Sequence, residues 1–205
     1  ARIKGFAQSE LIRTKTDAVD AGIIARFCLA MNPEPWTPPA PAVRRLQAIA
    51  RRIDALIAMR TQELNRLGVA HSLVEPSIKQ HLAYLDSEIE KLKKQMRSEI
   101  DDDPDLKNQR DLLITIPGIS DSTISIILAE LDFKNFESVR EVVAFMGLAP
   151  KDKISGTSVK GKPRLCKTGN ARLRKCFYMP AMVAIRFNPV VAEFQHRLKE
   201  NGKNG

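Results

Sequence analysis

The chain has 205 residues, of which 43% are hydrophobic and 5% aromatic, and its formal net charge is +9. This composition excludes a chain that is disordered throughout, and the length allows one sizeable core or two modest domains. No run of 18 apolar residues and no signal-peptide pattern occurs, so we expect no membrane association. The three cysteines have no paired spacing, which favours reduced thiols in the cytoplasm over a disulfide framework.

Most of the basic charge lies near the C-terminus. Residues 151–205 hold 13 Lys and Arg against 3 Asp and Glu, whereas the first 150 residues are close to neutral. Residues 151–175 alone carry nine basic groups against Asp152. A basic segment interleaved with glycine, serine and apolar residues predicts a polyanionic partner, with a solvated surface or solubilising tail as the alternative.

Residues 1–16 are polar and are expected to be irregular, and the spacing of apolar residues predicts a helix over 17–31. Asp17 and Asp20 begin this helix three residues apart, which places their Cβ atoms about 5–6 Å from each other. Two such carboxylates can hold a divalent ion such as Mg²⁺, and the alternative is that Asp17 caps the helix with Asp20 in its first turn. The five prolines of residues 32–41 predict an extended linker and a domain boundary.

Residues 42–105 are predicted to form two long helices. Apolar residues recur at spacings of three and four on each side of a break at residues 68–76. The first seam consists of Val43, Leu46, Ala50, Ile53, Ile57, Leu64 and Leu67, and the second of Ile78, Leu82, Leu85, Ile89, Leu92 and Met96. This pattern predicts an antiparallel helical hairpin or coiled coil that pairs copies of the chain, and ordinary bundle helices explain it equally well. The acidic residues 99–105 are interpreted as a solvated turn.

Residues 106–205 are expected to form a compact α-rich domain. The apolar residues 112–131 are interrupted by a turn at Gly118, after which a helix restarts. The arrangement resembles a helix-hairpin-helix element, in which the region of Gly118, Ser120 and Thr123 presents backbone N–H groups to a DNA phosphate. An ordinary turn in a core explains the pattern equally well. Further helices are predicted over residues 139–146, 170–186 and 189–198, and a small β-hairpin within 151–168.

The basic segment contains both the candidate phosphate ligands and the candidate nucleophile. The predicted nucleic-acid contacts in it are Lys160, Lys162, Arg164, Lys167, Asn170, Arg172 and Arg174. Ser155 and Ser158 lie in the same glycine-rich setting, and a serine hydroxyl surrounded by cations is suited to attack phosphorus. Judged from spacing alone, a serine in such a segment is far more often a turn residue.

Taken in this order, the segments resemble the DEDD-type transposases of insertion sequences, a family associated with bridge-RNA-guided recombination. The resemblance covers residues 10–190 and rests on TKTDAVDAGIIARF, ITIPGISDSTISIILAEL and FMGLAPKDKISGTSVKGKPRLCKTGNARLRKCFY. It implies a mainly α chain from a bacterium or archaeon, made of four parts. These are the remnant of an RNase H-like domain with a metal-binding helix (1–31), the linker (32–41), the coiled-coil hairpin (42–105) and a transposase domain with a catalytic serine (106–205).

The resemblance also implies a mechanism. Asp17 and Asp20 match the last two of the family's four metal-binding acids, and Ser155 matches its nucleophile, with Ser158 as the runner-up. The implied reaction is attack of Ser155 on a DNA phosphodiester, which gives a covalent phosphoserine link that strand exchange resolves. The implied cofactor is Mg²⁺, and the implied partners are DNA, a guide (bridge) RNA and further copies of the chain.

The strand-rich part that carries the family's first two acids does not occur in this sequence. We therefore expect a fragment of a longer protein, inactive or nearly so by itself. One alternative is a non-catalytic helix-hairpin-helix module that binds DNA and dimerises through the coiled coil. Another is a coiled-coil oligomerisation protein whose basic tail is incidental.

Overall fold

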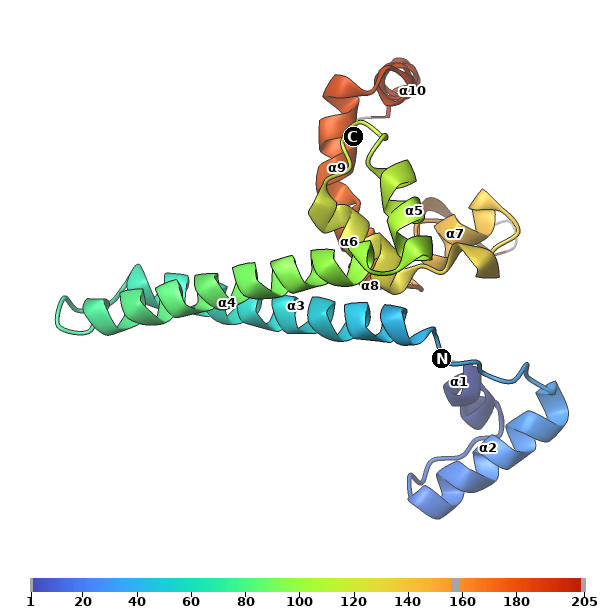
Figure 1. Ribbon diagram of the computed structural model, residues 1–205. Helices are drawn as coiled ribbons and strands as arrows, with labels where there is room; N and C mark the ends of the chain where they lie inside the picture. Colours follow the sequence, from blue (N-terminus) through green and yellow to red (C-terminus); the bar gives the residue numbers. More distant parts are fainter. Residues whose placement is uncertain (1, 156–158, 204–205) are drawn as a thin grey trace. The chain divides into compact units, whose positions relative to one another are not determined.

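The computed structural model describes residues 2–155 and 159–203, and the chain divides into two compact units, Ala1–Pro39 and Ala40–Gly205. The predicted mainly α fold is confirmed, because helices dominate both units and the sheet that the structure describes has two short strands (Figure 1). Among the described residues, no helix combines the length and the apolar character that crossing a membrane requires.

The first unit consists of helices α1 (Arg2–Ser9) and α2 (Asp17–Met31). The expectation that residues 1–16 are irregular is therefore wrong for the segment that forms α1. The ring of Phe6 packs edge-to-face on Phe27 of α2, with 5.6 Å between the ring centroids. This contact explains the error, because so short a helix is stabilised by packing rather than by its own propensity.

The second unit begins with the predicted helical hairpin, which is confirmed. Helices α3 (Pro41–Leu67) and α4 (Glu75–Asp101) lie side by side in opposite directions (Figure 1). Leu56, Leu85 and Ile89 are buried between them. Leu85 and Ile89 belong to the predicted seam, but in α3 Leu56 is buried while the predicted Ile57 and Leu64 are 44% and 42% exposed. The stripe that faces α4 thus departs from the predicted spacing, because an α-helix has 3.6 residues per turn.

Shorter helices follow the hairpin. Asp103 caps α5 (Pro104–Leu113), so this acid of the predicted solvated turn accepts backbone N–H groups of its first turn. The remaining helical elements are α6 (Asp121–Glu130), η1 (Phe133–Asn135), α7 (Val139–Phe145), α8 (Ala171–Cys176), α9 (Tyr178–Phe187) and α10 (Pro189–Glu200). The single helix expected over residues 170–186 is divided into α8 and α9, because Pro180 has no N–H to donate to the carbonyl of Cys176.

Helix α6 is the centre of the second unit. Its Ile124 and Leu128 pack in one cluster with Leu46 of α3 and Ile100 of α4. On another face, Ile127 packs in a second cluster that contains residues of α7 and α8. Since α6 is apolar on most of its circumference, it is buried and connects the helical hairpin to the C-terminal helices.

The predicted β-hairpin is confirmed as an antiparallel pair of strands. Strand β1 (Pro150–Ser155) pairs with β2 (Val159–Leu165), and the register shifts between Lys151 and Lys153. The shift accommodates Pro163, which lies opposite this interval and has no N–H for a regular ladder.

Candidate nucleic-acid interface

The β-hairpin positions the candidate nucleophile. Ser155 is the last residue of β1, and its backbone pairs with Val159 at the start of β2. Ser155 therefore lies at the end of the hairpin that is distant from the Pro150–Leu165 pair. The alternative nucleophile, Ser158, lies outside the described residues.

The opposite end of this hairpin, its root, is fixed to α7 by backbone hydrogen bonds. The N–H of Cys166 donates to the carbonyl of Ala149 at 2.9 Å, and the N–H of Lys167 donates to that of Gly147 at 3.0 Å. One turn further, the N–H of Asn170 donates to the carbonyl of Phe145 at 2.8 Å. The chain that leaves β2 is thus held against the segment that leads into β1.

Two glycines make this backbone contact possible. Gly147 and Gly169 have φ angles of +70° and +154°, in a region that favours glycine. A Cβ atom on Gly169 would overlap the carbonyl oxygen of Phe145, and one on Gly147 would lie 2.7 Å from a guanidinium nitrogen of Arg174. The glycines of the GLAP and KTGN motifs are therefore required by the hairpin root.

Three predicted phosphate contacts bind protein groups instead. Asn170 caps α8 through its Oδ1, and its Nδ2 donates to Glu130 at 2.8 Å. Arg172 forms ion pairs of 2.9 Å with Glu130 and 2.8 Å with Asp54. Arg174 donates to the carbonyl of Met146 at 2.9 Å. These side chains join α8 to α3, α6 and the end of α7. The charge of Arg172 is neutralised by two carboxylates, and Arg174 donates to a backbone carbonyl.

Other cations of the basic segment are exposed. Arg164 and Lys167 are exposed and form no ion pair with any described residue. Lys160 and Lys162 belong to β2. Lys175 of α8 is also exposed and unpaired in the described part of the chain, although the sequence analysis did not select it. The sequence signal for Lys175 is its spacing of three residues from Arg172, since residues so spaced share a helix face.

The turn before α6 packs directly against α9. Gly118 has a φ of +99°, and a Cβ atom there would lie 3.1 Å from the carbonyl oxygen of Pro180. Ser120 is the N-cap of α6 but makes no side-chain capping bond, and its Oγ lies 3.2 Å from the Oγ1 of buried Thr123. The first N–H groups of α6 therefore have no capping side chain, which leaves them able to bind a phosphate oxygen.

A groove of about 390 Å³ lies between this turn and helices α8 and α9. It brings together four of the predicted contacts, namely Gly118, Ser120, Thr123 and Arg172. It is lined further by Asp54, Ser122, Ile126, Lys175, Cys176, Met179, Pro180 and Val183. We call it the α6–α9 groove. Burial raises the pKa of Cys176 to about 11, so this thiol contributes no charge to the groove at neutral pH.

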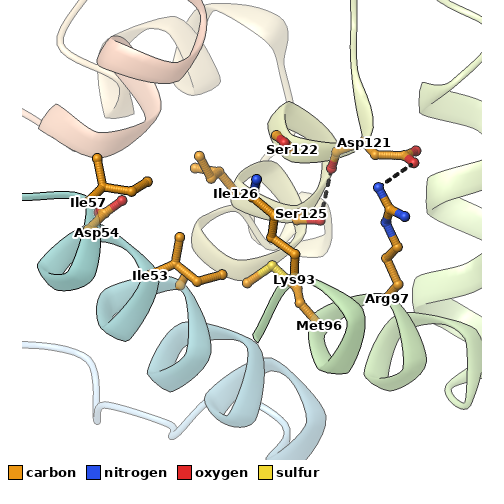
Figure 2. Close-up of a pocket in the computed structure, with 11 residues that line it drawn as sticks. Ile53, Asp54, Ile57, Lys93, Met96, Arg97, Asp121, Ser122, Ser125 and Ile126 are labelled. Atoms are coloured by element: carbon orange, nitrogen blue, oxygen red, sulfur yellow. Dashed lines mark hydrogen bonds and ion pairs between the residues drawn. The ribbon is translucent and has the colours of Figure 1, made fainter. Parts of the chain in front are cut away.

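A smaller cavity of about 130 Å³ lies where α3, α4 and α6 meet (Figure 2). Arg97 of α4 reaches toward Asp121 at the start of α6, with 3.6 Å between the charged atoms. Lys93 lines the same cavity above the apolar side chains of Ile53 and Met96. Arg97 therefore contacts the start of α6, whereas Arg172 pairs with Glu130 at its end.

The two candidate metal ligands lie in the first unit. Asp17 and Asp20 occupy the first turn of α2, but the N-cap is Thr16, whose Oγ1 accepts the N–H of Val19 at 3.3 Å. The alternative that Asp17 caps the helix is therefore wrong. Asp20 is half-buried and lines a groove of about 570 Å³ between α1 and α2, together with Lys4 and other residues of this unit.

The donor set of these two acids fits part of a divalent-ion site. Carboxylate oxygens are preferred ligands of Mg²⁺, which takes six ligands in an octahedron. In the part of the chain that the structure describes, no group of three or more His, Cys, Asp or Glu residues could hold a metal. Asp17 and Asp20 thus supply at most two of the ligands.

Two family models match the chain. The model described as a transposase of the IS116/IS110/IS902 family matches residues 110–196. The model for the DEDD transposase of IS110 matches residues 1–70. The first match contains the α6 turn, the β-hairpin and α8, and the second contains Asp17 and Asp20.

Curated relatives extend over almost the whole chain. The pilin gene-inverting protein of Moraxella bovis is 29% identical over 204 residues, which cover 98% of this chain and 63% of the relative. The transposase for insertion sequence element IS1328 of Yersinia enterocolitica is 27% identical over 212 residues, covering 87% of this chain and 61% of the relative. The chain therefore spans less than two thirds of the length of these relatives.

Proposed function

The chain belongs to the DEDD-type transposases of insertion sequences, and from this premise we propose that it serves DNA strand cleavage and exchange through the hydroxyl of Ser155. The observation that carries the proposal is the placement of Ser155 at the distal end of the β-hairpin, whose root is fixed by Gly147, Gly169 and Asn170. The printed names of two relatives, a gene-inverting protein and a transposase, agree with a DNA rearrangement.

The chemistry proposed for Ser155 is a transesterification. Its hydroxyl gives up a proton, its oxygen forms an ester bond to phosphorus, and one phosphorus–oxygen bond of the DNA strand breaks. The departing strand end leaves as a hydroxyl after taking up a proton. Lys160 of β2 pairs in register with Ile154, the neighbour of Ser155. A cation at this end of the hairpin favours the step because negative charge develops on the phosphoryl oxygens.

Asp17 and Asp20 are proposed to bind Mg²⁺ together with acids from outside this chain segment. When bound, Mg²⁺ neutralises charge on a phosphodiester and orients it. The removal of Asp17 from the capping role supports this proposal, because Thr16 already satisfies the helix N-terminus. The two carboxylates are then available as ligands of the metal ion.

DNA, a guide RNA and further copies of the chain are the proposed partners. The start of α6 and the exposed cations of the hairpin are suited to a nucleic-acid backbone, which contributes affinity without reading sequence. Self-association is supported by exposed apolar side chains on and beside the α3–α4 hairpin, including Leu64, Val69 and Leu73, which are 42%, 89% and 84% exposed. Light scattering tests the dimer, and a monomer at all concentrations would contradict it.

The catalytic proposal is tested by trapping the covalent intermediate. A protein that carries this sequence, extended to the length of its curated relatives, is incubated with Mg²⁺, target DNA and guide RNA, and is then denatured. We expect a protein–DNA adduct that disappears with Ser155→Ala and persists with Ser158→Ala. An adduct that survives Ser155→Ala would reject this residue as the nucleophile.

The 205 residues alone are expected to bind DNA without forming the adduct, because only two of the proposed acids are present. Binding is measured across salt concentrations, since contacts to several phosphates give a steep inverse dependence. If the extended protein also bound DNA but formed no adduct, the non-catalytic DNA-binding function would replace the catalytic one.

A further inference from the structure

The α6–α9 groove combines apolar and polar lining residues, as small-molecule sites do. Its volume of about 390 Å³ lies within the usual range of such sites, about 300–1,000 Å³. Met179, Val183 and Ile126 give it apolar surface, and the hydroxyl-bearing Ser120 and Ser122 line it from the α6 side. Such a combination accepts a flat apolar group that carries hydrogen-bonding edges.

The charges of the groove favour a phosphate beside that group. Its carboxylate, Asp54, is already paired with Arg172 at 2.8 Å, and Arg172 is paired again with Glu130. Lys175 is exposed and has no carboxylate partner among the described residues. Lys175 is therefore the lining cation that a ligand can neutralise, whereas Arg172 already faces two carboxylates. An apolar peptide side chain would use the apolar surface but would leave Lys175 without a counter-charge.

We propose that the α6–α9 groove holds one unstacked nucleotide of a DNA or RNA strand, with its base against Met179 and Val183 and its phosphate at Lys175. The inference rests on the proposed nucleic-acid function and adds to it a place where a base leaves the stack. Proteins that act on nucleic acids extrude bases into apolar pockets, and RNA is recognised largely through unstacked bases.

The test uses binding of the chain to four probes. These are a perfect DNA duplex, the same duplex with one bulged nucleotide, and the two RNA counterparts. We expect the bulged probe to bind at least about tenfold more tightly than the perfect duplex, which corresponds to about 1.4 kcal/mol. The pair in which this preference is larger identifies the strand as DNA or RNA.

Two variants of α9 test whether the preference for the bulged probe arises in the α6–α9 groove. Met179→Trp fills the groove, and because Met179 is 64% exposed, the substitution should leave the melting temperature unchanged. It is expected to abolish the preference for the bulge while retaining affinity for the perfect duplex. Met182→Trp is the matched control, since Met182 is 49% exposed on the same helix and does not line the groove; it should preserve the preference.

Lys175→Gln gives a second readout. Loss of one phosphate contact should lower the slope of log affinity against log salt by about 1 for the bulged probe. A preference that persists in Met179→Trp, or equal binding of bulged and perfect probes, would overturn the groove proposal while leaving the proposed function intact. Failure to bind all four probes would overturn both.

Discussion

The basic segment has a first half, residues 151–165 of the β-hairpin, and a second half, residues 166–175 after it. Their side chains make different contacts, although the sequence makes the two halves look alike. In the second half, Asn170, Arg172 and Arg174 bind Glu130, Asp54 and backbone carbonyls. In the first half, Arg164 of the β-hairpin is exposed and has no carboxylate partner in the described structure. One half builds the root of the hairpin, and the other leaves positive charge exposed.

This difference shows that the charge of a segment does not report how many of its cations can bind a ligand. Arg172 is satisfied by acids from α3 and α6, which are remote in sequence, so its charge is largely cancelled within the protein. Arg164 on the hairpin has no such partner among the described residues. The distinction predicts that substitutions of paired cations such as Arg172 lower stability, whereas substitutions of unpaired cations such as Arg164 and Lys175 weaken ligand binding.

The largest effect is expected at the root of the hairpin. Gly169→Ala should lower the free energy of unfolding by about 3–5 kcal/mol, because the new Cβ overlaps the carbonyl of Phe145 and the positive φ is strained. Denaturant unfolding measures the loss. Gly68→Ala is the control, since Gly68 has a helical φ of −62° and the nearest atom to a new Cβ, the carbonyl oxygen of Asn65, would lie 3.6 Å away. Equal stability of the two variants would contradict a structural role for the KTGN glycine.

A second large loss is expected for Arg172→Gln. Glu130, whose side chain is 14% exposed, would lose its cation, and Asp54 would lose its partner. We expect a loss of about 2–4 kcal/mol, since an unpaired carboxylate with little access to water is unfavourable. Arg45→Gln serves as the matched control, because the Arg45 side chain is 56% exposed in its pair with Glu99 and should contribute less than about 1 kcal/mol. A smaller loss of stability for Arg172→Gln than for Arg45→Gln would show that the ion pairs of Arg172 do not stabilise the fold.

Much of the fold is predictable from local pattern. The apolar seams through Leu46, Leu85 and Ile89 predict the α3–α4 hairpin, because their period depends on neighbouring residues alone. The β-hairpin and the turn at Gly118 are marked by glycine and by changes of composition. The local pattern does not predict helix α1, because this helix depends on packing of Phe6 against Phe27, which is remote in sequence.

The candidate site is less predictable, because its residues are sorted by distant contacts. No local pattern shows that Asp54 and Glu130 converge on Arg172 and so remove it from the cations available to a ligand. The local pattern likewise does not single out Lys175, because only the fold brings it to the groove that contains four of the predicted residues. The roles of Ser155, Asp17 and Asp20 came from the family resemblance and stay predictions.

The separation of structural from ligand-binding residues can also be tested at the start of α2. Thr16→Ala should cost about 1 kcal/mol of stability, because it removes the side chain that caps the helix. Asp17→Asn keeps this cap and should change stability by less than about 0.5 kcal/mol. Thermal unfolding compares the two variants. A larger loss for Asp17→Asn would show that the carboxylate serves the fold rather than a bound ion.

A still smaller change in stability is expected for Arg164→Gln, which tests the ligand-binding half directly. The free energy of unfolding should change by less than about 0.5 kcal/mol, since the side chain is exposed and unpaired with any described group. The slope of log affinity for DNA against log salt should fall by about 1, corresponding to one lost phosphate contact. Arg174→Gln should show the reverse pattern, because its guanidinium donates to the carbonyl of Met146. The same slope in wild type and Arg164→Gln would refute the proposed contact.

The smallest effect concerns two thiols, one at the end of β2 and one at the end of α8. Hydrogen bonds from the side chain and backbone of Thr168 hold the pKa of Cys166 below its ordinary value, and nearby Lys151 acts in the same direction. Burial instead raises the pKa of Cys176 to about 11. Because the thiolate is the reactive form, alkylation of Cys166 should reach half its maximal rate at a pH below the midpoint of an unperturbed thiol. Cys176 should stay largely unmodified at that pH.

Mass spectrometry after brief alkylation at a series of pH values measures both midpoints in one sample. Thr168→Val removes the hydroxyl that bonds near Cys166 and should raise the midpoint of this thiol without moving that of Cys176. If the two thiols reacted alike, the end of β2 would offer Cys166 no more polar an environment than α8 offers Cys176. The opposite shifts of the two pKa values would then be contradicted.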